Sequence, residues 1–263
     1  MKNSVSGECW KMQHSASGAE VLRILETLGG AKCTLAIEEK NLNVSPETLM
    51  LSEKVSSFTL NGYNPVEQFS EDQMLALLKV FNMNYNTCGK YTEQDGTRVF
   101  IEDLVILKVA PDGYITYTSD YNESDTLGGI TLSGANDRAQ VLDSTDAIVS
   151  RLMSLAGGEA KMYLRDIRRD GNAWYAEYGH SFGGIPIDRH ISGHSAQFVI
   201  FSGRVSRLEF YMRRFESAGT IIYPLPPRIA IASVTGGEGA EISLRYTDGG
   251  SSGIDAQWYT KIK

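Results

Sequence analysis

The chain has 263 residues, 42% of them hydrophobic and 22% charged, and its formal net charge is −7. This is the composition of a globular protein with a sizeable core, and the length fits either one large domain or two smaller ones. The negative charge argues against non-specific nucleic-acid binding, which needs a basic surface to neutralise phosphates, and against electrostatic docking on anionic lipid.

The chain has three cysteines, Cys9, Cys33 and Cys88, and no two of them have the spacing of a C-x-x-C pair. A structural zinc site and a disulfide framework are therefore both disfavoured, whereas one disulfide plus a free thiol, or three thiols, stay open. No apolar run is long enough to cross a bilayer, and the first residues lack the pattern of a signal peptide. We therefore expect this chain, as it stands, not to span a membrane.

Two amphipathic helices are predicted in the first half of the chain. The first follows Ser17, which has Glu20 three residues on in the spacing of a capping box, and it ends at a pair of glycines. A short strand is expected at residues 33–37. The second helix follows Ser70, with Gln73 in the same capping position, and its apolar face is formed by Met74, Leu77, Leu78 and Phe81.

Residues 98–109 form a long, mostly apolar run, which predicts one strand in the middle of a sheet. Gly113 predicts a hairpin turn after it, because glycine accepts the positive φ that such a turn needs. Residues 119–143 are rich in Asn, Ser, Asp and Gly, which predicts a long connection between domains. We therefore expect an N-terminal α+β domain over residues 1–140 and a C-terminal α+β domain over residues 141–263.

The C-terminal domain is predicted to hold two units in which a helix is followed by antiparallel strands. In the first unit, Ser144 caps the helix. The second begins with a short helix at Pro226, passes a turn over residues 248–253 and ends with a strand over residues 254–262. A less regular third copy begins at Ser70. The predicted fold class is α+β, with repeated helix-plus-antiparallel-sheet units.

Between these two units, a loop around Gly183 and Pro186 leads to another hairpin. In its second strand, Leu208, Phe210 and Met212 alternate with polar or amphipathic side chains, which is typical of a sheet with one face in the core and one in water. We therefore predict a candidate partner surface on the outer face, formed by Arg207, Glu209, Tyr211 and Arg213.

Six segments of the C-terminal half carry a resemblance to a known family: PPRIAI (226–231), ISLRY (242–246), DAQW (255–258), AEYGH (176–180), GIPI (184–187) and FVIFSGRV (198–205). In these segments the chain resembles the YycH/YycI family. The helix-plus-hairpin units also look like those of PepSY domains.

The resemblance implies a non-catalytic regulatory protein on the extracytoplasmic face of a Gram-positive cell membrane. It implies binding to a membrane sensor histidine kinase of a two-component system, whose activity the protein modulates. A paralogous regulatory protein is a second partner that the resemblance suggests. It implies no catalytic residue and no cofactor. The family's membrane association is through an N-terminal helix, which is absent from this chain.

Two other hypotheses stay open. The chain could be a PepSY-like module that restrains a secreted protease or senses cell-wall material. It could also be a hydrolase or hold a metal through Asp188, His190 and His194, with Ser195 as a nucleophile. The residue after His190 is not the Glu of the zinc-protease signature, and no G-x-S-x-G elbow is present, so we expect neither site.

Overall fold

The computed structural model describes residues 33–35, 50–52, 55–120, 129–132, 137–189, 193–233, 241–250 and 252–261. The chain divides into two compact units. The terminal unit comprises residues 1–57, 221–244 and 257–263, and the central unit comprises residues 58–220 and 245–256. The helix predicted after Ser17 lies outside the described residues.

The described part of the terminal unit is small. Strand β1 (Cys33–Leu35) pairs antiparallel with β2 (Met50–Ser52), and the short helix α4 (Pro227–Ser233) contacts β2. Strand β16 (Gln257–Lys261) pairs with β14 (Glu241–Asp248). The indole Nε1 of Trp258 donates a hydrogen bond of 2.9 Å to the carbonyl oxygen of Leu225, which fixes β16 to the segment before α4.

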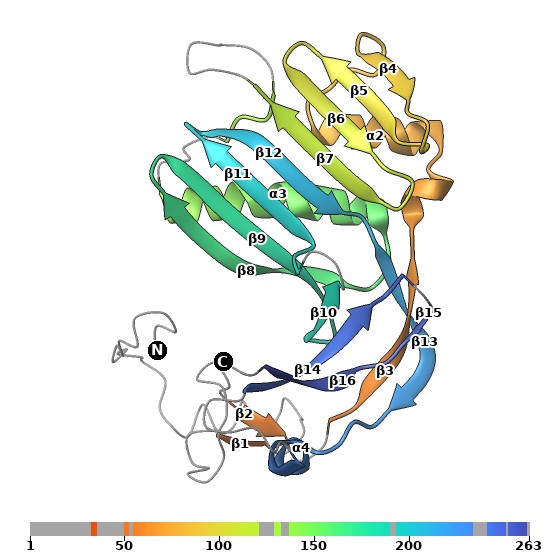
Figure 1. Ribbon diagram of the computed structural model, residues 1–263, viewed down its shortest axis with the longest axis vertical. Coiled ribbons are helices and arrows are strands. Elements are labelled where there is room, and N and C mark those ends of the chain that lie inside the picture. The colour runs from red at the N-terminus through yellow and green to blue at the C-terminus, as the bar shows by residue number, and fades with distance from the viewer. Residues whose placement is uncertain are drawn as a thin grey trace, which may run out of the picture. The chain divides into compact units, whose positions relative to one another are not determined.

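The central unit is built on one large, mostly antiparallel sheet (Figure 1). Its hydrogen-bonded order is β10, β9, β11, β12, β7, β6, β5, β4, and β8 also pairs with β9. The bounds of these strands are β4 Gly89–Thr92, β5 Arg98–Glu102, β6 Val105–Val109, β7 Tyr114–Ser119, β8 Lys161–Asp170, β9 Ala173–Phe182, β10 Ile185–Arg189, β11 Ala196–Phe201 and β12 Arg204–Tyr211. The end of β14 pairs in parallel with β10, at Ile187 and Tyr246.

A second, smaller sheet has the order β13 (Arg214–Ile222), β3 (Ser57–Tyr63), β15 (Ser252–Ile254). A 3-10 turn (η2, Pro65–Gln68) then leads into helix α2 (Glu71–Val80). The capping box predicted at the start of α2 is confirmed: the Ser70 hydroxyl accepts from Gln73 N, and the Gln73 side chain accepts from Ser70 N.

Helix α3 (Arg138–Ala156) begins earlier than predicted, and Ser144 lies inside it. Its first turn is capped by Asp137, whose side chain accepts from the backbone N–H of Gln140 at 2.9 Å. The apolar stripe extends upstream to Val141, which is buried in the core. The buried Thr145 does not interrupt this stripe, because its hydroxyl bonds to the carbonyl oxygen of Val141.

Helices α2 and α3 lie together against one face of the large sheet, behind the strands in Figure 1. The sheet turns alternate side chains toward them, and these form the core with the apolar stripes of the helices. The buried sheet residues include Phe100, Leu107, Ile115, Tyr117, Ala176, Tyr178, Phe198, Leu208 and Phe210. Inside this core, the hydroxyls of Tyr178 and Thr145 lie 2.7 Å apart and satisfy each other.

The strand predicted over residues 98–109 is two strands. A tight turn at Asp103 and Leu104 joins β5 to β6, with Glu102 opposite Val105, and Asp103 adopts a positive φ of 50°. Aspartate tolerates that backbone region better than most residues, and the turn contains no glycine that would have marked it in the sequence. The hairpin turn predicted at Gly113 is confirmed between β6 and β7, with φ of 88°.

Strands β10 and β13 were not predicted, and β15 forms where a turn was expected. Each is short of alternating apolar residues or contains Pro or Gly. The last predicted strand, over residues 254–262, is divided between β15 and β16. Strands β13 and β15 both pair with β3, which is distant in sequence, and local pattern does not reveal such a partner. Strand β10 pairs with the neighbouring β9, with Ile185 opposite Phe182, and also with the distant β14.

The predicted division of the chain at residue 140 does not coincide with the two units. Strand β7 pairs with β12 in register from Tyr114 opposite Tyr211 to Thr118 opposite Arg207, so one sheet continues across that position. Part of the polar connection also packs into the core: Ile130 and Leu132 are buried, and Ile130 N donates to the Tyr117 hydroxyl at 3.0 Å.

The described fold is thus α+β, mostly sheet with few helices. None of the helices in the described part of the chain is long and apolar enough to cross a bilayer.

Candidate partner-binding surface

The face of the large sheet that points away from α2 and α3 carries a row of mostly polar side chains. The strand registers place the following residues side by side on β8, β9, β11, β12, β7 and β6: Asp166, Glu177, Gln197, Glu209, Thr116 and Lys108. The next row on the same face contains Arg168, Tyr175, Val199, Arg207, Thr118 and Ile106. We call these two rows the polar face.

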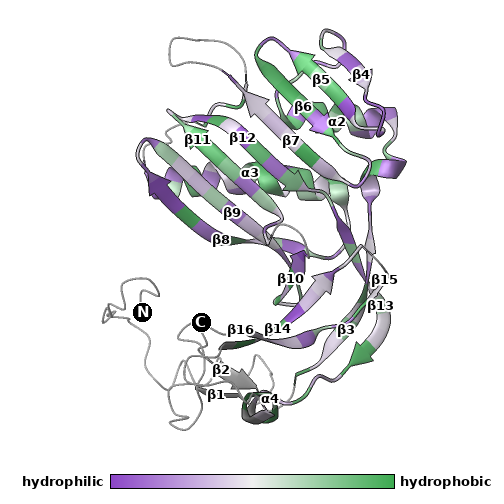
Figure 2. Cartoon of the chain, viewed as in Figure 1, coloured by the Kyte–Doolittle hydropathy of each residue, from purple (hydrophilic) through white to green (hydrophobic). Residues whose placement is uncertain are grey.

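The polar face results from alternation along the strands, which register shifts interrupt in β8 and between β11 and β12. Its residues are exposed or partly buried, whereas their neighbours Ala176, Phe198 and Leu208 are fully buried toward the helices. Figure 2 shows hydrophilic residues interspersed with hydrophobic ones along these strands, most clearly at the end of β8. A register shift between Leu164 and Asp166 in β8 places Asp166 opposite Glu177.

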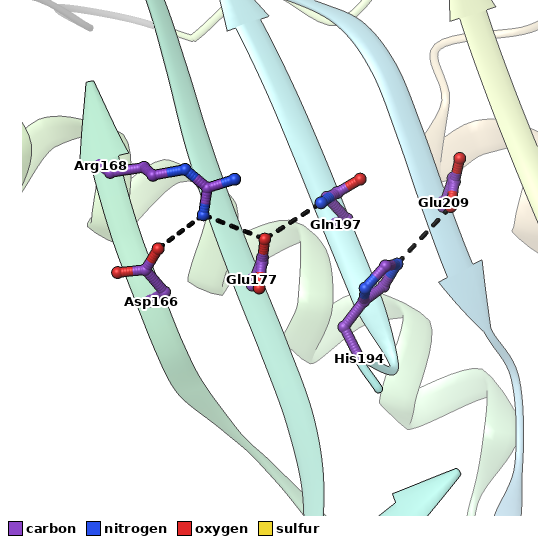
Figure 3. Close-up of polar contacts among 6 residues, drawn as sticks. All are labelled: Asp166, Arg168, Glu177, His194, Gln197 and Glu209. Carbon is purple, nitrogen blue, oxygen red and sulfur yellow. Dashed lines mark hydrogen bonds and ion pairs between the residues drawn. The ribbon is translucent and has the colours of Figure 1, made fainter. Parts of the chain in front are cut away.

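Arg168 joins the two outer strands of the polar face (Figure 3). Its Nη1 donates to Asp166 Oδ2 at 2.7 Å and to Glu177 Oε1 at 3.1 Å. The same Glu177 oxygen accepts from Gln197 Nε2 at 3.1 Å, and the Arg168 guanidinium lies over the Tyr175 ring. The charged groups on β8 and β9 are therefore held in position by one another and by the amide of Gln197 on β11.

Glu209 is the second centre of the polar face. It pairs with Arg207 on the same strand, its Oε2 lies 3.6 Å from His194 Nε2, and it accepts a hydrogen bond from the Tyr114 hydroxyl (Figure 3 shows the His194 contact). Partial burial alone would raise the pKa of Glu209, but the Tyr114 hydrogen bond and the Arg207 charge outweigh it and lower the pKa. Glu209 is therefore ionised at neutral pH.

Tyr114 is affected in the opposite direction. Burial, with its hydrogen bond to Glu209, raises the pKa of Tyr114 to about 12. Its ring lies 6.0 Å from that of Tyr211, its partner across the β7–β12 pair. The phenol therefore stays neutral and acts as a donor that fixes the Glu209 carboxylate.

Only part of the predicted partner surface is exposed. Arg207 is exposed and Glu209 is partly buried, but Tyr211 and Arg213 are buried. Tyr211 does point to the polar face, where the guanidinium of Arg189 covers its ring. Strand β12 ends at Tyr211, so Arg213 does not continue its alternating pattern of side chains. The Arg213 side chain pairs with Asp248 instead.

The residues considered for a hydrolase or metal site have separate partners. Asp188 Oδ2 accepts from Arg245 Nη1 at 2.6 Å, and Ser195 is buried with its hydroxyl accepting from the backbone N–H of His180. His194 contacts Glu209, and His190 lies outside the described residues. Across the ranges that the structure describes, no three His, Cys, Asp or Glu side chains gather as a metal site would require.

Sequence reasoning missed Tyr114, Gln197 and His194 as members of the polar face or its support. Tyr114 enters it through the pairing of β7 with β12, which joins segments about a hundred residues apart in sequence. Gln197 enters it through the β11–β12 hairpin, opposite Glu209. The alternation within each strand was visible in the sequence, but the order of the strands in the sheet was not.

Cys88 is a buried free thiol, and burial raises its pKa.

No protein-family model, no curated protein and no solved structure matches the chain.

Proposed function

We propose that the chain is a non-catalytic regulatory protein that binds a membrane sensor histidine kinase of a two-component system and modulates its activity. The observation that carries this proposal is the polar face, a broad sheet surface whose charged groups are held in place by one another. The resemblance of the C-terminal segments to the YycH/YycI family supplies the identity of the partner and the extracytoplasmic location. A paralogous regulatory protein is a further partner under this proposal.

The polar face suits selective binding because its charges are already ordered. Arg168 and Glu177 are fixed across two strands, and Glu209 is fixed by Tyr114 and Arg207. Ordering these groups before binding lowers the entropy lost on association, and mixed charges favour one complementary partner over others. A partner kinase with two conformations would be shifted toward whichever conformation matches this charge pattern better.

We also propose that α3 with β8 and β9, and α4 with β14 and β16, are related PepSY-like units. Each consists of a helix followed in sequence by strands. A second candidate function, a PepSY-like module that senses a ligand or restrains a protease, is favoured by one feature. This is a cavity in the central unit, lined by charged and aromatic residues.

The test measures binding of the whole chain to the extracytoplasmic segment of a sensor histidine kinase of the kind that the YycH/YycI family regulates, by surface plasmon resonance. Arg207→Glu and Arg168→Glu each reverse one charge on the polar face. We expect each to weaken binding by about tenfold or more, because the new glutamate would face the acidic groups of the kinase that the arginine contacts under this proposal. The matched control is Arg151→Glu, which makes the same charge change at an exposed position of α3.

Equal binding by the two polar-face variants and the control would show that another surface meets the kinase. Absence of any binding to the kinase, together with inhibition of a secreted protease by the chain, would favour the second candidate function.

A further inference from the structure

The central unit contains a cavity of about 770 Å³ at the edge of the large sheet. It is lined by residues that include Glu67 from η2, Asp112 from the β6–β7 turn, Arg189 from β10, Tyr211 from β12, Arg213 and Asp248. A volume of this size is typical of sites for small molecules or short peptides. Binding of a ligand in this cavity would not require the kinase proposed above.

Arg189 is the unusual residue of this cavity. Its guanidinium lies over the ring of Tyr211 and is partly buried, and this burial lowers the pKa of Arg189. Within the described ranges, no carboxylate forms an ion pair with it, although the charges of Asp112 and Asp248 are near enough to oppose this lowering of its pKa. A partly buried cation usually has an anionic partner, and a tyrosine ring replaces one only in part.

The other arginine of the cavity is already neutralised. Arg213 donates two hydrogen bonds to Asp248, through Nε and Nη2, each 2.9 Å long. Its capacity to attract a ligand anion is therefore small. Of the two arginines that line the cavity, Arg189 is the one that is not in an ion pair, and the planar pair of donors of a guanidinium matches the two oxygens of a carboxylate.

The remaining charges limit how negative a ligand can be. Glu67, Asp112 and Asp248 are three carboxylates against the two arginines among the lining residues. Asp112 accepts from the Tyr211 hydroxyl at 3.1 Å and from Tyr114 N at 2.9 Å, which holds it on the wall of the cavity. A ligand with several negative charges would be repelled. A ligand with one carboxylate and an amine or amide donor could pair its carboxylate with an arginine and its donor with a lining carboxylate.

We infer that this cavity binds an amino acid or the C-terminal end of a short peptide, with the ligand's free carboxylate on Arg189 and its N–H donors toward Asp112 or Glu67. Both sources present the same carboxylate chemistry. The volume exceeds the needs of a single small amino acid, so a peptide should bind more tightly.

The test uses isothermal titration calorimetry of the full chain with four probes: alanine, tri-alanine, tri-alanine amide and inorganic phosphate. We expect tri-alanine to bind more tightly than alanine. Tri-alanine amide should bind at least about tenfold more weakly than tri-alanine, because the amide cannot accept the bidentate charge-assisted pair. These comparisons use the unaltered protein and do not depend on the folding of any variant.

A variant then assigns the effect to Arg189. Arg189→Gln should weaken tri-alanine binding to the level of the amide, while Arg214→Gln, at an exposed arginine paired with Glu216, should leave it unchanged. Equal binding of acid and amide, tighter binding of phosphate than of tri-alanine, or no binding of either alanine or tri-alanine at millimolar concentration would each overturn the inference. Tighter binding of alanine than of tri-alanine would assign the site to free amino acids.

Discussion

Arg213 and Asp248 form a two-bonded ion pair that is almost completely shielded from solvent. The Arg213 Nε and Nη2 atoms each lie 2.9 Å from an Asp248 oxygen, and the side chains are 8% and 2% exposed. Asp248 Oδ1 also accepts from the backbone N–H of Gly250 at 3.0 Å. The pair joins the segment after β12 to the end of β14, so it connects parts of the central unit that are distant in sequence.

The first prediction concerns this pair. Asp248→Asn should lower the free energy of unfolding by about 3–5 kcal/mol, because it leaves the buried Arg213 charge without its counter-charge. Replacing both residues by apolar ones, Arg213→Met with Asp248→Leu, should cost less than Asp248→Asn alone, since no unpaired charge is left. Urea unfolding followed by circular dichroism measures all three proteins. A double variant less stable than the single one would contradict a penalty that arises from the unpaired charge.

The sequence predicted the elements whose signals are local. The capping box of Ser70 with Gln73, the turn at Gly113 and the alternation of Leu208 with Phe210 each depend on residues a few positions apart, and each is present. The start of α3 was missed because Ser144 resembles a cap as well as Asp137 does. Only packing of Val141 against the sheet decides between them.

The candidate site was predictable in part for the same reason. Alternation places Arg207 and Glu209 on one face, but it continues only as far as the strand does. Arg213 lies past the end of β12, and its partner Asp248 is 35 residues away in sequence. Burial of Tyr211 under Arg189 depends on where β10 lies, and β10 was predicted as a loop.

The second prediction compares two glycines with positive φ in hairpin turns. Gly113 has φ of 88°, and a Cβ there would lie 2.6 Å from the carbonyl oxygen of Met212. Gly171 has φ of 57°, and a Cβ there would meet nothing within 4 Å. Gly171→Ala should therefore lower the free energy of unfolding by roughly 1–2 kcal/mol, from backbone conformation alone.

Gly113→Ala should lower it by about 1–3 kcal/mol more, because the backbone of Met212 must also move. This shift would break the hydrogen bond of 2.9 Å from Met212 N to Gly113 O. Thermal unfolding of the two variants side by side measures the difference. Equal stability of Gly113→Ala and Gly171→Ala would mean that the backbone of Met212 moves away from position 113 without a loss of free energy.

The third prediction concerns the dependence of stability on pH. His180 is buried on β9 beside the Phe215 ring, its Nε2 has no hydrogen-bond partner in the described structure, and its backbone N–H donates to Ser195 Oγ. Burial lowers the pKa of His180 to about 4, opposed by Asp248 and assisted by the nearby charges of Arg213 and Arg189. The imidazole is therefore neutral in the folded protein at neutral pH.

In the unfolded chain His180 should titrate at its ordinary value, near 6.5. Between that pH and about 4, the unfolded chain binds a proton that the folded chain does not, so lowering the pH favours unfolding. We expect a loss of stability of up to about 3 kcal/mol across this window from His180 alone. Urea unfolding at a series of pH values measures it, with His180→Phe as the variant that cannot titrate.

Comparing how steeply the free energy of unfolding changes with pH in the two proteins separates the contribution of His180 from that of the acidic residues. Glu209, whose lowered pKa also makes acid destabilising, keeps its partners Tyr114 and Arg207 in both proteins, so its contribution cancels. The unaltered protein should therefore lose stability more steeply than His180→Phe as the pH falls from 6.5. Parallel curves would mean that His180 gains a proton in the folded state as readily as in the unfolded one, which requires water or a carboxylate to reach its Nε2.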